Sequence, residues 1–194
     1  MGRILLVRSS AYRTSRAAKT ATVLRDIGHE VNIMTWNRGI EEEDSPLRKE
    51  MEEDGFHVDE IWVGEASYGQ GVWGLGTRLR YMIAFAQYVR LGNFDAVHAI
   101  DLASTFPVVV LRALGLHDAA FVFDVADYVE LYYTIPDLLA HAIGTVSDWV
   151  LSLSDFIVIP DDNRKDRIPA SLQSKVTTVT NAPDFDEELL EQLM

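Results

Sequence analysis

Two short apolar runs, at 96–100 and 119–123, most constrain how this chain can fold. Each has the length of a buried strand, and the segment 104–114 between them has the length of a helix. Gly115 suits the position just after a helix end, because glycine adopts positive φ cheaply. A strand, helix and strand of this length predict a right-handed crossover and a parallel sheet, so both strands end at the same edge.

Polar side chains gather where these two strands end. His98 lies within the first run and Asp101 directly follows it, while Asp124, Asp127 and Tyr128 follow the second. Open α/β sheets bind ligands at this edge, and carboxylates accept hydrogen bonds strongly from hydroxyl groups. The five residues are therefore candidates for one binding site. Each also has a structural interpretation: a buried histidine bonded to backbone, a helix N-cap or a loop cap.

The same alternation continues along the whole chain. Further strands are expected at 3–7, 31–36, 56–63, 155–159 and 175–179. Helices are expected at 15–27, 76–91 and 137–153, with a short polar helix at 162–172. The pattern predicts an α/β protein with a doubly wound, mainly parallel sheet of about seven strands and helices on both faces.

Composition narrows the classes of partner. The chain has 194 residues, 48% of them apolar, and a net charge of −13, which opposes binding to nucleic acid. It contains no cysteine, which excludes disulfides, thiolate catalysis and cysteine-based metal sites. No apolar run approaches the roughly 18 residues of a membrane span, and the N-terminus does not resemble a signal peptide. A cytoplasmic protein is expected.

Charge is distributed unevenly along the sequence. Residues 41–54 include eight acidic side chains, which we interpret as a solvated helix face or loop. Residues 71–92 instead carry three arginines and no acid, together with aromatic side chains. This basic segment is compatible with peripheral contact to an anionic membrane, but we favour a core helix with aromatic packing.

A second group of polar residues follows the first strand. The group consists of Ser9, Ser10, Tyr12, Arg13 and Arg16. A helix N-terminus with nearby cations can receive a phosphate or carboxylate, so we expect these residues to contact a charged group of a donor or acceptor. Ordinary surface roles are the alternative. The sequence contains neither a P-loop nor a G-x-S-x-G motif.

Four landmarks, in order, resemble one enzyme family. They are Gly28–Val31 (GHEV), 95–101 (DAVHAID), 154–160 (SDFIVIP) and 175–181 (KVTTVTN). Together they resemble the N-terminal, acceptor-side domain of the family 4 glycosyltransferases of the GT-B fold. The chain departs from that pattern at Ser9–Ala11, where the family commonly has paired glycines. It also has Ile100 and Ala126 where the family has histidines.

The resemblance implies one Rossmann-like half of a two-domain enzyme. Residues 1–181 would form the N-terminal domain and 182–194 the start of a linker, with Asn181 at the domain boundary and the donor-binding C-terminal domain absent. The expected function is acceptor recognition in a retaining, hexosyltransferase-like enzyme. Such an enzyme moves a sugar from a nucleotide-sugar donor to a hydroxyl acceptor, which could be lipid-linked or a glycan. The chain alone would be inactive, and neither a metal nor another cofactor is implied.

Two other interpretations stay open from the sequence. The first is a non-catalytic binding or assembly module that works with a separately encoded donor domain. The second is an unrelated flavodoxin-like or nucleotide-binding domain. No catalytic residue can be assigned in any of the three cases.

Overall fold

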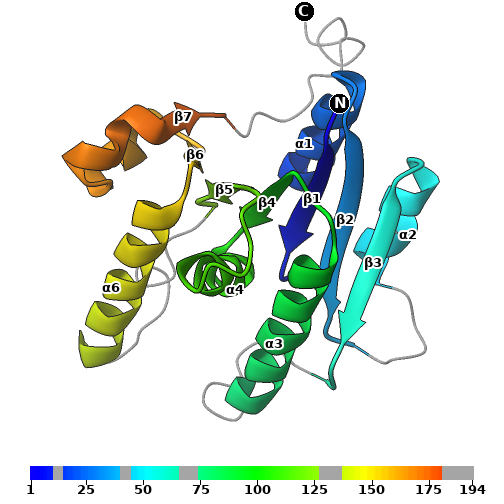
Figure 1. The fold of residues 1–194 in the computed structure, drawn as a ribbon, viewed down its shortest axis with the longest axis horizontal. Coiled ribbons are helices and arrows are strands. Elements are labelled where there is room, and N and C mark those ends of the chain that lie inside the picture. The colour runs from blue at the N-terminus through cyan, green and yellow to red at the C-terminus, as the bar shows by residue number, and fades with distance from the viewer. Residues whose placement is uncertain (11–14, 40–44, 66–73, 127–136, 181–194) are drawn as a thin grey trace, which may run out of the picture.

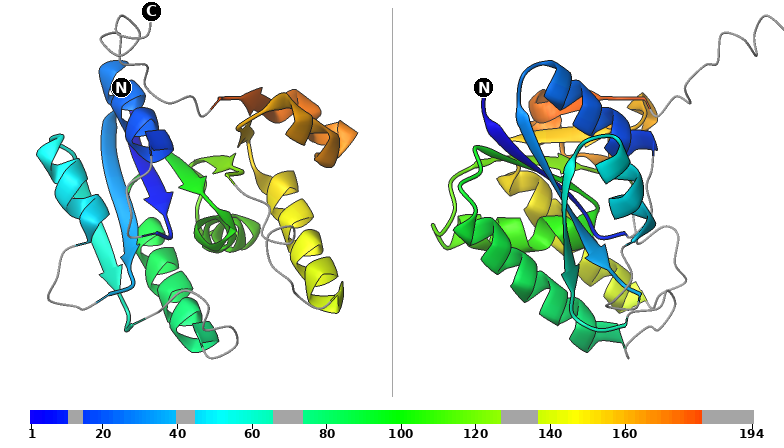
Figure 2. Two further views of the ribbon diagram at one scale, coloured as in Figure 1. Left: turned by 180° about the vertical axis from the view of Figure 1, so that it is seen from behind. Right: turned by 90° about the vertical axis from the view of Figure 1, so that its right-hand side faces the viewer.

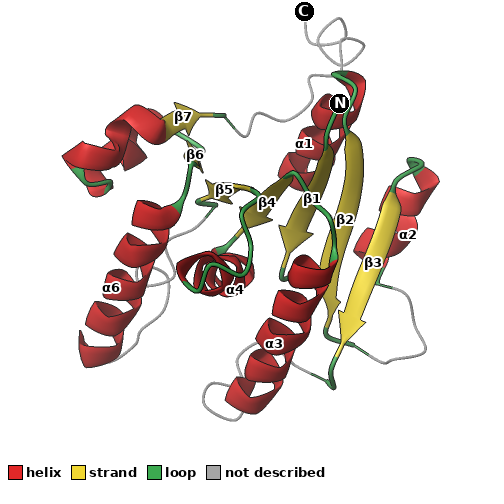
Figure 3. Ribbon diagram, viewed as in Figure 1, coloured by secondary structure: helices red, strands yellow, loops and turns green. Residues whose placement is uncertain are grey.

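The computed structural model describes residues 1–10, 15–39, 45–65, 74–126 and 137–180. Strands and helices alternate along the described chain, as Figures 1 and 3 show. The strands are β1 (Arg3–Arg8), β2 (Glu30–Asn37), β3 (His57–Trp62), β4 (Ala96–Ile100), β5 (Ala120–Asp124), β6 (Phe156–Ile159) and β7 (Val176–Thr178). The α-helices are α1 (Ser15–Asp26), α2 (Pro46–Glu53), α3 (Leu75–Leu91), α4 (Leu102–Ala113) and α6 (Asp137–Leu153). Two 3₁₀ helices, η2 (Asp162–Arg167) and η3 (Ala170–Lys175), precede β7.

The seven strands form one sheet in the order β3-β2-β1-β4-β5-β6-β7, and every neighbouring pair is parallel. This confirms the predicted doubly wound α/β fold. The chain adds strands outward from β1 in one direction and then, from β4, in the other. The switch point between β1 and β4 is where such sheets leave a crevice at the carboxyl ends of their strands.

Helices cover both faces of the sheet, as the two views of Figure 2 show. The larger core lies between the sheet and α3, α4 and α6, while the smaller core lies under α1 and α2. Strand β1 contributes to both, because Leu5 and Val7 point into the larger core and Leu6 into the smaller one. Apolar side chains on both faces are what a covered parallel strand requires.

Helix ends follow local sequence signals. Gly28 and Gly115, after α1 and α4, both adopt positive φ, at 95° and 66°. The expected polar helix at 162–172 is instead divided into η2 and η3. Pro169 lies between the two segments; it has no backbone N–H to donate and disfavours helical geometry at the residue before it.

Candidate functional site

Strand register brings three polar residues, Ser9, Asp101 and Asp124, to one stretch of the sheet edge. Arg8 at the end of β1 lies opposite Ile100 at the end of β4, and Ile100 lies opposite Asp124 at the end of β5. The residues that follow β1 and β4, Ser9 and Asp101, therefore sit side by side at the switch point. Ser9 and Asp101 are 92 positions apart in the sequence, and the parallel pairing of β1 with β4 brings them together.

Asp101 is held in place by hydrogen bonds from Ser9 and Ser104. Its Oδ2 accepts hydrogen bonds from the backbone N–H and the hydroxyl of Ser9, at 3.0 and 2.8 Å. Its Oδ1 caps α4 by accepting from the Ser104 backbone N–H at 2.9 Å, which confirms the expected N-cap. The carboxylate thus ties the β1 end to the start of α4, and it remains half-buried at the surface.

The backbone of Asp101 is strained. Its φ of 85° and ψ of 158° lie in a region that is essentially restricted to glycine. Such a conformation costs about 1–3 kcal/mol and persists where surrounding contacts enforce it. Among the described residues other than glycine, Asp101 alone has positive φ. Strain of this kind gathers at functional sites, which singles out Asp101 among the predicted site residues.

Two opposing effects set the pKa of the Asp101 carboxyl group. Burial raises the pKa of its carboxyl group, whereas the hydrogen bonds from Ser104 and Ser9 lower it, and the balance leaves the pKa above its ordinary value. A carboxylate can accept about four hydrogen bonds. In the described part of the chain its donors come from Ser9 and Ser104.

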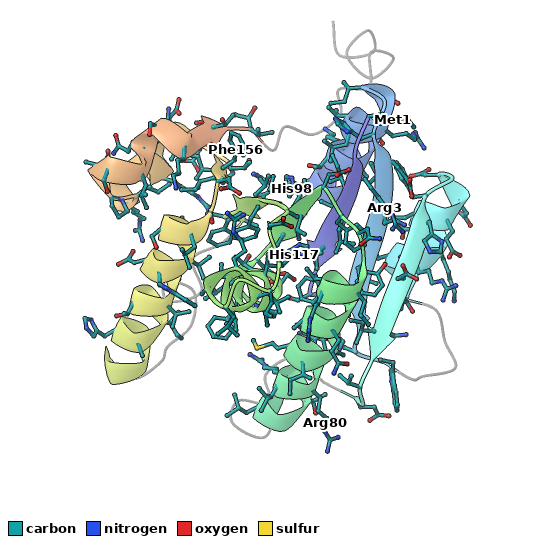
Figure 4. All side chains as sticks on the ribbon, viewed as in Figure 1. Met1, Arg3, Arg80, His98, His117 and Phe156 are labelled. Atoms are coloured by element: carbon teal, nitrogen blue, oxygen red, sulfur yellow. The ribbon has the colours of Figure 1, made fainter. Side chains whose placement is uncertain are left out.

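Asp124 lies beside this group but is engaged internally. Arg16 of α1 contacts both of its oxygens, with Nε to Oδ2 and Nη2 to Oδ1 each at 2.7 Å. The side chains are 8% and 1% exposed, so this is a buried, two-pronged ion pair. His98 Nε2 lies 3.3 Å from Asp124 Oδ2, and Figure 4 shows His98 on β4 in the middle of the sheet. Asp124 therefore braces Arg16 and His98.

Arg16 also reaches the far side of the domain. Its Nη1 donates to the backbone carbonyl of Val179 at 3.4 Å, just after β7. The predicted phosphate-contact residue Arg16 thus joins α1, β5 and the segment after β7. Ser10 lies at the same edge, where its carbonyl accepts a hydrogen bond from the Thr35 hydroxyl at 2.7 Å. Ligand roles for both residues stay predictions.

A buried polar cluster near Asp101 was not anticipated from the sequence. It consists of the Trp36 indole and the Tyr81 and Ser104 hydroxyls, and all three side chains are buried. The Trp36 and Tyr81 rings stack with centroids 4.5 Å apart. Burial raises the pKa of Tyr81, and the charge of Asp101 raises it further, so its hydroxyl stays protonated. The segment 71–92 indicated aromatic packing there, but not a buried tyrosine hydroxyl near Asp101.

The other predicted residues lie outside the described part of the chain: Tyr12, Arg13, Asp127, Tyr128 and Asn181. Within the described ranges, no group of histidine, aspartate and glutamate side chains is arranged to hold a metal ion.

The family model for the glycosyl transferase 4-like domain matches residues 14–181. The chain belongs to this family. No curated protein sequence matches this glycosyl transferase 4-like domain. The match decides against an unrelated flavodoxin-like domain, in agreement with the sheet order.

Solved structures place the same domain within the GT-B fold. Sucrose-phosphate synthase from Thermosynechococcus elongatus matches with a TM-score of 0.68 and 12% identity over 100% of this chain and 52% of that one. MurG from Acinetobacter baumannii matches with a TM-score of 0.60 and 13% identity over 97% and 48%. Anabaena HepE, solved in complex with UDP and glucose, matches with a TM-score of 0.57 and 12% identity over 100% and 50%. The chain thus spans about half the length of these proteins and corresponds to one Rossmann-like domain.

Proposed function

We propose that this domain is the acceptor-side half of a retaining glycosyltransferase that transfers a sugar from a nucleotide-sugar donor to a hydroxyl acceptor. The observation that carries the proposal is Asp101, which is strained, half-buried and held by Ser9 and Ser104 at the switch point of the sheet. Family membership and the likeness to half of several GT-B proteins support it. A cytoplasmic site of action goes with the proposal, since a chain without cysteine suits a reducing compartment.

In this proposal Asp101 accepts a hydrogen bond from the acceptor hydroxyl. His98 is assigned to the same site, where its Nε2 lies 3.3 Å from Asp124 Oδ2. The Arg16–Asp124 pair holds the floor of the site without binding the acceptor through its own charges. Asp127 and Tyr128 complete the predicted acceptor contacts.

The division of labour follows from what one domain can supply. Holding the acceptor in a reactive orientation converts a bimolecular step into an effectively unimolecular one, which accounts for a large part of many enzymatic rate enhancements. The donor would be bound by a second, facing domain. The chain alone would therefore bind acceptor but catalyse no transfer.

Backbone amide NMR of the 194-residue chain tests this division of labour. Titration with candidate acceptor glycans is expected to shift the amide signals of Ser9, His98 and Asp101, at the carboxyl edge of the sheet. Titration with nucleotide sugars is expected to shift them little, and calorimetry should detect no tight binding.

The matched variant is Asp101→Asn, which keeps the size of the side chain and the Oδ1 cap to α4, but loses the carboxylate charge and places an amide NH2 opposite the Ser9 donors. It should weaken acceptor binding by about tenfold or more, since a hydrogen bond to a charged group contributes about 1.5–3 kcal/mol. Micromolar binding of a nucleotide sugar to the isolated chain would contradict the proposal. So would acceptor binding that is unchanged in the variant.

A further inference from the structure

Helix α3 presents an unexpected apolar stripe to solvent. One face of the helix packs into the larger core through Tyr81 and Phe85, as the aromatic pattern predicted. Away from that face, Leu75, Leu79 and Ile83 are 63%, 57% and 52% exposed. These three residues are spaced four apart, so they form a continuous row along the helix. Exposed apolar residues are common singly, but a row of this kind marks an interaction surface.

Helix α3 carries basic side chains in addition to this apolar stripe. Arg78, Arg80 and Arg90 are exposed, and the helix contains no acidic residue. Across the described ranges, none of these three arginines takes part in an ion pair. The chain as a whole carries a net charge of −13. Helix α3 therefore presents a basic and apolar face on an acidic molecule.

The stripe lies at the ligand-binding end of the domain. In Figures 1 and 2, α3 begins below the carboxyl ends of β1 and β2 and runs back along the sheet. Figure 4 shows Arg80 near this first, protruding end of the helix. A surface that engaged the start of α3 would thus lie beside the edge that carries Ser9 and Asp101.

We propose that the outer face of α3 docks the domain onto an anionic lipid bilayer. Leu75, Leu79 and Ile83 would enter the headgroup region while Arg78 and Arg80 contact lipid phosphates, so that burial of apolar side chains and electrostatic attraction act together. None of the described helices is long and apolar enough to cross a bilayer, so the contact is peripheral.

Charge also favours a bilayer over a second copy of the chain. Two copies meeting along α3 would bring like-charged arginines together, which is unfavourable in the absence of acidic partners on the same helix. An anionic bilayer instead attracts this face and repels the acidic remainder of the domain. It would therefore orient the molecule with its carboxyl edge near the lipid surface.

Vesicle co-sedimentation of the 194-residue chain tests the proposal. The chain is expected to sediment with phosphatidylcholine vesicles that contain roughly one third phosphatidylglycerol, and not with phosphatidylcholine alone. Arg78→Gln combined with Arg80→Gln should weaken the partition about 25-fold, since each arginine near the surface contributes about fivefold. Leu79→Gln combined with Ile83→Gln should weaken it about tenfold or more.

The matched control is Val23→Gln combined with Ile27→Gln, an apolar pair of the same spacing at the end of α1 that is 58% and 65% exposed. It should bind vesicles like the unchanged chain. All variants should keep the same circular dichroism and melting temperature, because the altered side chains are exposed. The measurement requires no sugar donor, so its outcome is independent of the proposed transfer.

Three results would overturn the membrane proposal. They are failure of the unchanged chain to bind anionic vesicles, equal binding by the α3 and α1 variants, and self-association through α3 in sedimentation velocity without lipid binding.

Discussion

At the scale of single residues, the main finding is that two predicted ligand contacts bind each other. Arg16 and Asp124 are separated by 108 positions in sequence, yet they form a buried pair with contacts of 2.7 Å. Burial of either charge without its partner would be strongly unfavourable, because the low-dielectric interior does not replace lost hydration. The pair therefore stabilises the fold, and a ligand role for Arg16 stays a prediction.

Removing one partner of this pair should destabilise the fold. We expect Arg16→Met and Asp124→Leu each to lower the free energy of unfolding by about 3–5 kcal/mol, since each leaves an unpaired buried charge. The double variant should lose clearly less than the sum of the two, because no charge is stranded. Urea unfolding of the four proteins measures the coupling.

Glu52→Gln is the control for that experiment. Glu52 pairs with Arg48 at 2.9 Å, but both side chains are more than a third exposed. Its loss should cost less than about 1 kcal/mol. If Arg16→Met cost no more than this control, the structural interpretation of the buried pair would be wrong.

At the scale of elements, one arginine joins α4 to the strands beside it. Arg112 near the end of α4 contacts both oxygens of Asp155 at 2.5 and 3.1 Å and donates to the Ala119 carbonyl at 2.9 Å. Asp155 in turn accepts from the Phe121 backbone N–H at 2.7 Å. These contacts hold the starts of β5 and β6 against α4, at the edge opposite the candidate site.

This contact should make stability depend on pH. Burial alone would raise the pKa of Asp155, but the hydrogen bonds from Arg112 and Phe121 outweigh it and hold the pKa below its ordinary value of 3.8. The unfolded chain therefore binds more protons in that range, so the contribution is present above pH 3.8 and is lost as the pH falls through the folded-state pKa. Asp155→Asn should cost about 1 kcal/mol near neutral pH, a modest value because the side chain is 39% exposed.

Urea midpoints of the unchanged chain and Asp155→Asn, measured near neutral pH and again near pH 3, test this expectation. The difference between the two proteins should shrink at the acid end. Glu30→Gln, which alters the exposed pair with Arg3, provides the comparison and should change little at either pH. A difference that grew on acidification would contradict the assignment.

At the scale of the whole molecule, two cores share one sheet. Leu5 and Leu6 are neighbours on β1, are 0% and 1% exposed, and point into the larger and the smaller core respectively. Because the central strand contributes to both layers, neither layer can lose its packing without disturbing the other. The domain should therefore unfold as one unit.

Leu5→Ala and Leu6→Ala test this coupling. Each should lower the free energy of unfolding by about 2–5 kcal/mol through lost burial and cavity formation. In both variants tryptophan fluorescence, which includes the buried Trp36, should follow the same single transition as far-ultraviolet circular dichroism. Two separate transitions, with Leu6→Ala affecting one of them, would show that the layers unfold independently.

Most of the fold could be predicted because its signals are local. A strand covered on both faces needs a continuous apolar run, and a helix end needs a residue such as Gly115 that tolerates positive φ. The N-cap at Asp101 was equally predictable from the sequence, since its partner Ser104 is three residues away. Pro169 was overlooked, and the segment around it forms two 3₁₀ helices in place of one helix.

The carboxyl edge as the location of a site also followed from sequence, because parallel strands must end together. The sequence did not predict which side chains meet at this edge. The pairing of Arg16 with Asp124, the contact of Ser9 with Asp101 and the burial of Tyr81 beside it depend on strand order and helix placement. Local patterns encode elements over a few residues, whereas the partners of a polar side chain are set by segments about a hundred residues distant, which come together only when the sheet forms.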